Sequence, residues 1–227
     1  NAKICGSSTV YNNAKVSGDA IVSGDAQVYN NAKVYGNAIV SGESEVYNNA
    51  QVYNNANVFG ITKVYGNAQV YDDVMAYGET EIHGNAQVYG NAIIDDCAVF
   101  GDARIFDNAT VMDKTEICDS AMIYGDAQIC GAKIWHNAKV CGRARVLYYA
   151  QIFENARIHG QALVGDNVQV SGNAEIFGDA HLFDNVAIWD NAIVYDAATI
   201  KVNVKIYDSA KVCGNAMICK DAQVYGN

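Results

Sequence analysis

Proline is absent from the 227 residues, and no apolar run approaches the length of a membrane-spanning segment. Proline cannot donate a backbone hydrogen bond, so its absence is consistent with strands that are paired on both sides. A membrane-spanning helix needs about 20 consecutive apolar residues, so we expect no membrane insertion. Basic residues are also few, because 15 Lys and Arg face 25 Asp and Glu and give a net charge of −10. Phosphate binding needs clustered basic side chains, so we expect no nucleic-acid partner.

Patterns typical of catalytic or metal sites are scarce as well. The sequence contains no nucleophile elbow, no phosphate-binding loop and no calcium-binding nonapeptide. Four His residues are present, each in a different repeat: His83, His136, His159 and His181. A zinc site needs closely placed ligands. We therefore expect no metal and no cofactor, and we assign no catalytic residue.

The sequence consists almost entirely of one short repeat. Its form is turn, small, polar, aliphatic, aromatic, turn, as in Asn85-Ala86-Gln87-Val88-Tyr89-Gly90, and we number these positions one to six. The chain holds 38 such units, of which two, 97–101 and 132–136, have five residues. Position four is Val, Ile or Leu in all units but one, where Ala76 follows Val74 at position two. That exchange keeps the inward volume roughly constant, as a packed interior requires.

A longer period of three hexads lies within the first. Position two is Ala in 24 of 25 units of the first and third classes, but in the second class nine of 13 are other residues, such as Ser44 and Thr62. The structural repeat is therefore 18 residues. Positions two and four point to one side of an extended segment, and positions three and five to the other. Gly, Asn and Asp at position six tolerate positive φ and make a corner.

These periods predict an all-β fold, a parallel β-helix with triangular coils of 18 residues. The 38 units make about 12.7 coils with no loop insertions, and we expect a single solenoid domain over residues 1–227. The spacing in Val88-Tyr89-Gly90-Asn91-Ala92-Ile93 resembles the hexapeptide-repeat family over the whole chain. That resemblance implies a left-handed β-helix. Runs such as Asn31-Ala32-Lys33-Val34-Tyr35-Gly36 are similar to a bacterial group often labelled transferases by similarity.

Stacked coils turn outward position five into ladders of aromatic residues. We expect rings one coil apart to stack, which stiffens the solenoid. The alternative is an aromatic face that binds sugar rings or another copy of the chain. The candidate binding residues are Tyr29, Tyr47 and Tyr65 on the second side, and Tyr35, Tyr53, Tyr71 and Tyr89 on the third. Outward position three of the first side carries Ile21, Ile39, Met75 and Ile93, an apolar strip suited to a lateral contact.

The two five-residue units lie on the second side, and both lack position one. The same corner is therefore shortened twice, which predicts either a tolerated tight corner or a shallow ligand groove. The candidate groove residues are Asp95, Asp96, Phe100, Lys114, Trp135 and His136.

The seven Cys offer no pattern of disulfides. Six fall at position five, yet no two lie one coil apart on one side, so we expect free thiols and a reducing or anaerobic setting.

Three functions remain open. We favour a non-enzymatic structural or interaction rod that self-associates into filaments or forms a segment of a larger fibre or surface protein. Its end units, 1–6 and 221–226, are ordinary hexads rather than polar caps, which favours stacking end to end. A carbohydrate- or surface-binding module is the second reading. The third is an acyltransferase, which the family resemblance implies, although the expected projecting loops and C-terminal helix are missing.

Overall fold

The structure, a computed structural model, describes residues 1–226. Each hexad forms one short strand, and no helix occurs within the described residues. The chain divides into two compact units, Asn1–Lys114 and Thr115–Asn227, which are described in turn.

The first unit contains strands β1 to β19, arranged in three parallel sheets. Its first sheet consists of β1 (Lys3–Ile4), β4 (Ile21–Val22), β7 (Ile39–Val40), β10 (Asn57–Val58), β13 (Met75–Tyr77), β16 (Ile93–Asp95) and β19 (Thr110–Met112). Its second sheet consists of β2 (Thr9–Val10), β5 (Gln27–Val28), β8 (Glu45–Val46), β11 (Lys63–Val64), β14 (Glu81–Ile82) and β17 (Ala98–Val99). Its third sheet consists of β3 (Lys15–Val16), β6 (Lys33–Val34), β9 (Gln51–Val52), β12 (Gln69–Val70), β15 (Gln87–Val88) and β18 (Arg104–Ile105).

The second unit contains β20 to β38 in the same three-sheet arrangement. One sheet consists of β22 (Gln128–Cys130), β25 (Arg145–Leu147), β28 (Leu163–Val164), β31 (His181–Phe183), β34 (Thr199–Lys201) and β37 (Met217–Cys219). Another consists of β20 (Glu116–Ile117), β23 (Lys133–Ile134), β26 (Gln151–Ile152), β29 (Gln169–Val170), β32 (Ala187–Ile188), β35 (Lys205–Ile206) and β38 (Gln223–Val224). The last consists of β21 (Met122–Ile123), β24 (Lys139–Val140), β27 (Arg157–Ile158), β30 (Glu175–Ile176), β33 (Ile193–Val194) and β36 (Lys211–Val212).

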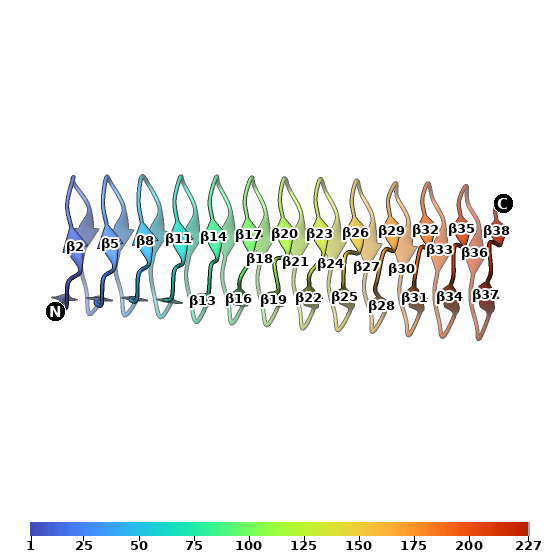
Figure 1. Ribbon diagram of the computed structural model, residues 1–227, viewed down its shortest axis with the longest axis horizontal. Helices are drawn as coiled ribbons and strands as arrows, with labels where there is room; N and C mark the ends of the chain where they lie inside the picture. Colours follow the sequence, from blue (N-terminus) through green and yellow to red (C-terminus); the bar gives the residue numbers. More distant parts are fainter. Residues whose placement is uncertain (227) are drawn as a thin grey trace. The chain divides into compact units, whose positions relative to one another are not determined.

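Within each unit, strands that lie three places apart along the chain pair in parallel (Figure 1). In the first unit Ile21 aligns with Ile39, 18 residues later, and the backbone N–H of Ile21 donates to the carbonyl of Ala38 at 2.9 Å. In the second unit Gln151 aligns with Gln169 in the same way. The predicted 18-residue triangular coil is confirmed.

The inward residues form the core of each unit. Val28 and Ile82 in the first unit, and Ile152 in the second, are fully buried. The exchanged pair Val74 and Ala76 is fully buried too, so the inferred swap of large and small side chains is confirmed. Narrow coils filled by Ala, Val and Ile leave room for no larger side chain, which explains why position two is so constant.

Position six forms the corner of every hexad, and its φ is positive throughout the described residues. Gly, Asn and Asp adopt this conformation at low cost. Val202 is an exception in residue type, since a β-branched side chain at φ +63° is strained.

Hydroxyl groups explain the different residue types at position two of the first unit's second sheet. Ser44 and Thr62 are fully buried, and each donates its hydroxyl to the carbonyl three residues earlier. The Thr62 Oγ1 to Phe59 oxygen distance is 2.8 Å. The buried hydroxyls therefore satisfy corner carbonyls that an Ala would leave without this partner.

Candidate functional site

The aromatic ladders of the first unit are stacked. On the second sheet, successive ring centroids are 4.6–5.0 Å apart and the ring planes differ by 1–10°. That ladder comprises Tyr11, Tyr29, Tyr47, Tyr65, His83 and Phe100. On the third sheet the spacing is 4.8–5.0 Å and the planes differ by 2–4°. That ladder comprises Tyr35, Tyr53, Tyr71, Tyr89 and Phe106.

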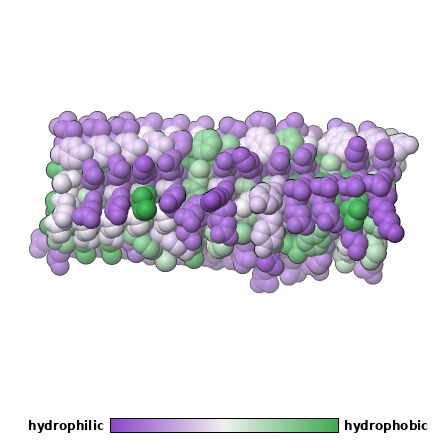
Figure 2. All heavy atoms as spheres, in the orientation of Figure 1, coloured by the Kyte–Doolittle hydropathy of each residue, from purple (hydrophilic) through white to green (hydrophobic). Residues whose placement is uncertain are grey.

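The tyrosine hydroxyls are anchored on the next coil. Tyr29 donates to Glu45 Oε2 at 2.7 Å, and Tyr53 donates to Gln69 Oε1 at 3.2 Å, in both cases to position three, 16 residues later. The same bond is made by Tyr11, Tyr35 and Tyr65. Rings of one ladder thus face each other, and their edges and polar ends face solvent. On the face drawn in Figure 2, hydrophilic side chains form rows beside paler ones.

Stacking changes the acidity of the ladder groups. Burial, with the negative charge of neighbouring acidic groups, raises the pKa of Tyr53 and of Tyr65 to about 12. The pKa of Tyr29 is raised further, first by burial and then by its hydrogen bond to Glu45. Burial lowers the pKa of His83, which favours its neutral form.

The shortened corner of the first unit is tied to the backbone. Asp96, at φ +52°, accepts the N–H of Glu79 on its carboxylate at 2.7 Å. The backbone carbonyl of Asp96 accepts the N–H of Lys114 at 2.7 Å. Burial raises the pKa of Asp95, and the charges of Asp96 and Asp113 raise it further. The structure brings these residues together at one corner, while Phe100 lies in the second sheet's ladder, stacked on His83.

The shortened corner of the second unit lies at Gly131, and the candidate residues Trp135 and His136 lie at the next corner along the chain. His136, at φ +56°, donates its backbone N–H to Asp119 Oδ2 at 3.0 Å. The Trp135 ring stacks on Phe153, with centroids 4.6 Å apart, and meets the His136 ring edge-on at 6.2 Å. The indole therefore belongs to a ladder, and His136 is the corner residue beside it.

Comparison with known proteins agrees with this architecture. A family model described as the YdcK beta solenoid repeat matches residues 14–30 and 26–42. The chain is a β-solenoid repeat protein. No curated protein matches the sequence. The matched residues lie in the first unit. They include Tyr29 and Tyr35, which belong to two different ladders.

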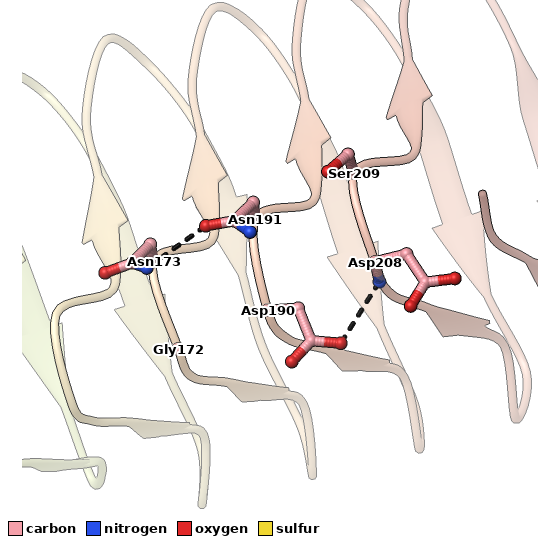
Figure 3. Close-up of a pocket in the computed structure, with 6 residues that line it drawn as sticks. All are labelled: Gly172, Asn173, Asp190, Asn191, Asp208 and Ser209. Carbon is pink, nitrogen blue, oxygen red and sulfur yellow. Dashed lines mark hydrogen bonds between the residues drawn. The ribbon is translucent and has the colours of Figure 1, made fainter. Parts of the chain in front are cut away.

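Two surface depressions of this β-solenoid were not predicted from the sequence, and both lie in the second unit. The larger, of about 570 Å³, is a polar corner lined by Gly172, Asn173, Asp190, Asn191, Asp208 and Ser209 (Figure 3). Its side chains already bond to the next coil. Asn173 donates to Asn191 at 3.1 Å, and the Asp190 carboxylate accepts the N–H of Asp208 at 3.2 Å. The recurrence of Asn and Asp at 18-residue spacing is the sequence signal that marks this corner.

The smaller depression, of about 190 Å³, surrounds Cys141. Tyr124 and His159 border it along the ladder, and Lys139, Arg157 and Glu175 border it on the side of position three. Within residues 1–226 no three His, Cys, Asp or Glu lie close enough to hold a metal ion. No helix of this part of the chain is long and apolar enough to span a membrane.

Proposed function

We propose that this β-solenoid is a non-enzymatic structural or interaction module that associates with further copies of itself. The observation that carries the proposal is the stacking of the ladder tyrosines on one another. Ring centroids 4.8 Å apart on both sides of Tyr53 leave its faces covered. The aromatic residues thus stabilise the coil stack itself.

The same geometry weighs against the second candidate, a carbohydrate-binding surface. Sugar rings pack on the open face of an aromatic ring, whereas these ladders present ring edges. The Gln and Glu side chains beside the rings are acceptors for the tyrosine hydroxyls, as Gln69 is for Tyr53. Carbohydrate binding by the ladders would require their stacking to open.

The histidines have surroundings that suit structural roles, which supports a non-catalytic module. His83 stacks between Tyr65 and Phe100, at 4.6 and 5.0 Å. His159 Nε2 lies 3.0 Å from a carboxylate oxygen of Glu175, and its ring stacks on Phe177. The acyltransferase implied by the hexapeptide-repeat resemblance is a further alternative, with acetyl-CoA binding as its test.

One surface supports association with another copy. On the outer side of the first sheet, Ile21 aligns with Ile39, and Met75, which is 40 % exposed, aligns with Ile93. Asn57 lies between Ile39 and Met75. The two apolar pairs offer a lateral contact.

Light scattering and negative-stain imaging over a range of protein concentrations test the proposal. We expect filaments or larger oligomers that grow with concentration. The variant Ile39→Lys with Met75→Lys should reduce lateral association, while Gln51→Lys, on another sheet, serves as a surface-charge control. A monomer at every concentration would refute self-association, and a discrete trimer that binds acetyl-CoA would favour the acyltransferase.

A triple variant separates the stiffening role from ligand binding. Replacing Tyr47, Tyr65 and Tyr71 with Ser removes rings from the interiors of two ladders. Under the proposal the variant loses thermal stability. If it stays as stable as the parent and instead loses binding to a glycan array, the carbohydrate function would replace the structural one.

A further inference from the structure

One ladder of the second unit is interrupted by a residue without a ring. Position five on the sheet of β21, β24, β27, β30 and β33 reads, in order, Tyr124, Cys141, His159, Phe177 and Tyr195. The rings of His159 and Phe177 stack at 4.9 Å, and those of Phe177 and Tyr195 at 5.1 Å. At Cys141 a small thiol stands where this ladder would carry a ring.

The interruption coincides with the 190 Å³ depression. Coils lie about 4.8 Å apart, so residues two coils apart on one ladder are separated by about 10 Å. Non-bonded carbon atoms pack at about 3.5–4.0 Å, which leaves space for one planar ring between Tyr124 and His159. The two side chains that border the depression along the ladder are thus both aromatic.

Two basic side chains lie where a substituent would point on a ring that filled this space. Where a ladder tyrosine of the first unit donates its hydroxyl, the acceptor lies at position three of the next coil, as Gln69 does for Tyr53, 16 residues earlier. The equivalent residue for Cys141 is Arg157, which aligns with Lys139 on the neighbouring strand. Within residues 1–226 neither Arg157 nor Lys139 forms an ion pair. Glu175, the nearby acid, lies 3.0 Å from His159 Nε2.

We propose that the Cys141 depression is a binding site for a small planar aromatic carboxylate. The ligand ring takes the place of the missing ladder ring between Tyr124 and His159. Its carboxylate points to the Arg157 guanidinium, with Lys139 adding positive charge. Stacking and charge-assisted hydrogen bonds together select a ligand that is both flat and anionic.

The second unit also contains a comparison site. Ser171 interrupts another ladder between Phe153 and Trp189, but the position-three residues beside it are Gln169 and Ala187, which carry no charge. We therefore expect aromatic anions to prefer the Cys141 site.

Calorimetry with benzoate and 4-hydroxybenzoate tests the proposal directly. Cyclohexanecarboxylate is the anionic control without a flat ring, and benzamide is the flat control without charge. We expect both controls to bind at least about tenfold more weakly than benzoate, because each lacks one of the two interactions. Equal binding of cyclohexanecarboxylate, or no benzoate binding at millimolar concentration, would overturn the proposal.

Three substitutions at two positions locate the site. Cys141→Tyr supplies the missing ring and should abolish benzoate binding, whereas Cys141→Ala leaves the space open and should bind as the parent does. Arg157→Gln should weaken benzoate roughly tenfold while leaving the weak binding of benzamide unchanged. Unchanged benzoate affinity in a folded Cys141→Tyr protein would place the ligand elsewhere.

The unmodified protein provides a measurement that does not depend on a variant folding. Benzoate should slow alkylation of the Cys141 thiol, read by peptide mass spectrometry, while leaving the exposed Cys213 on the same ladder unaffected. Equal alkylation rates at Cys141 with and without saturating benzoate would refute the site.

Discussion

Removing the ring of Tyr53 should destabilise the solenoid more than removing a ring at a ladder position with fewer contacts. The Tyr53 ring stacks at 4.8 Å on both Tyr35 and Tyr71, and its hydroxyl donates to Gln69 at 3.2 Å. A stacked aromatic pair contributes about 0.5–1.5 kcal/mol, and a hydrogen bond about the same. Tyr53→Ser should therefore cost about 1.5–4.5 kcal/mol of unfolding free energy.

Two matched variants divide this loss into its parts. Tyr53→Phe keeps both stacking contacts and should cost about 0.5–1.5 kcal/mol, the value of the hydroxyl bond. Tyr77→Ser removes the stacking of Tyr77 on Phe59, at 5.0 Å, and should cost about 0.5–1.5 kcal/mol for that pair. Urea unfolding followed by circular dichroism measures all three.

The order of the three losses of unfolding free energy tests whether stacking on two rings stabilises the coil stack. Tyr53→Ser should lose more unfolding free energy than either Tyr53→Phe or Tyr77→Ser. If Tyr53→Ser and Tyr77→Ser shift the urea midpoint equally, stacking on a second ring adds nothing, and the ladders do not stiffen the coil stack.

Four further predictions concern the corners, the buried hydroxyls and pH. Gly172→Ala should cost several kcal/mol, because its Cβ would lie 2.6 Å from the next coil's backbone nitrogen; Gly214→Ala has the same positive φ with open space, and should cost about 1–2 kcal/mol in a thermal melt. Thr62→Val should lose about 1–2 kcal/mol in urea unfolding, since the carbonyl of Phe59 loses its donor, whereas Thr62→Ser should retain most of it. Val202→Gly should raise the melting temperature by relieving about 0.5–1 kcal/mol of net strain, and an unchanged or lower value would contradict this. Burial raises the pKa of Tyr53 and of Tyr65 from 10.0 to about 12, so the unfolded chain releases its phenol protons first. The contribution of these tyrosines to the urea midpoint should be constant below pH 10 and be lost between pH 10 and 12, together with the rise of tyrosinate absorbance.

The fold was predictable because each physical requirement recurs in every hexad. Alternation fixed which side chains point inward, and the residue types at position six marked the corners that carry positive φ. The exchange of Val74 and Ala76 was readable as conserved volume. These features depend on neighbours one to four residues apart, which the sequence displays directly.

The sites depended on contacts that the hexad alone does not specify. The stacking of the ladder rings was predicted from the 18-residue period, as the rings of Tyr35 and Tyr53 show at 4.8 Å, but the hydroxyl acceptors on the next coil were not. Thr62 contributed to the 18-residue period that was recognised in the sequence. The bond from its buried hydroxyl to the carbonyl of Phe59 depends on the geometry of the corner, which the sequence does not display. The depression at Cys141 was not predicted, because it becomes visible only when the neighbours of Cys141 in adjacent coils are in place.

The shortened corners show where this kind of chain tolerates a change in length. Cys97 directly follows the corner residue Asp96, with position one deleted, yet Ile82 still aligns with Val99 on the next strand. In the second unit Ile134 follows the other deletion and still aligns with Ile152. Each hexad sets its own inward and outward alternation, so a residue lost at a corner does not invert the strands that follow. A residue lost within a strand would invert that strand's two faces. Single-residue insertions and deletions in related genes should therefore collect at corners, and longer changes should come in multiples of 18 residues.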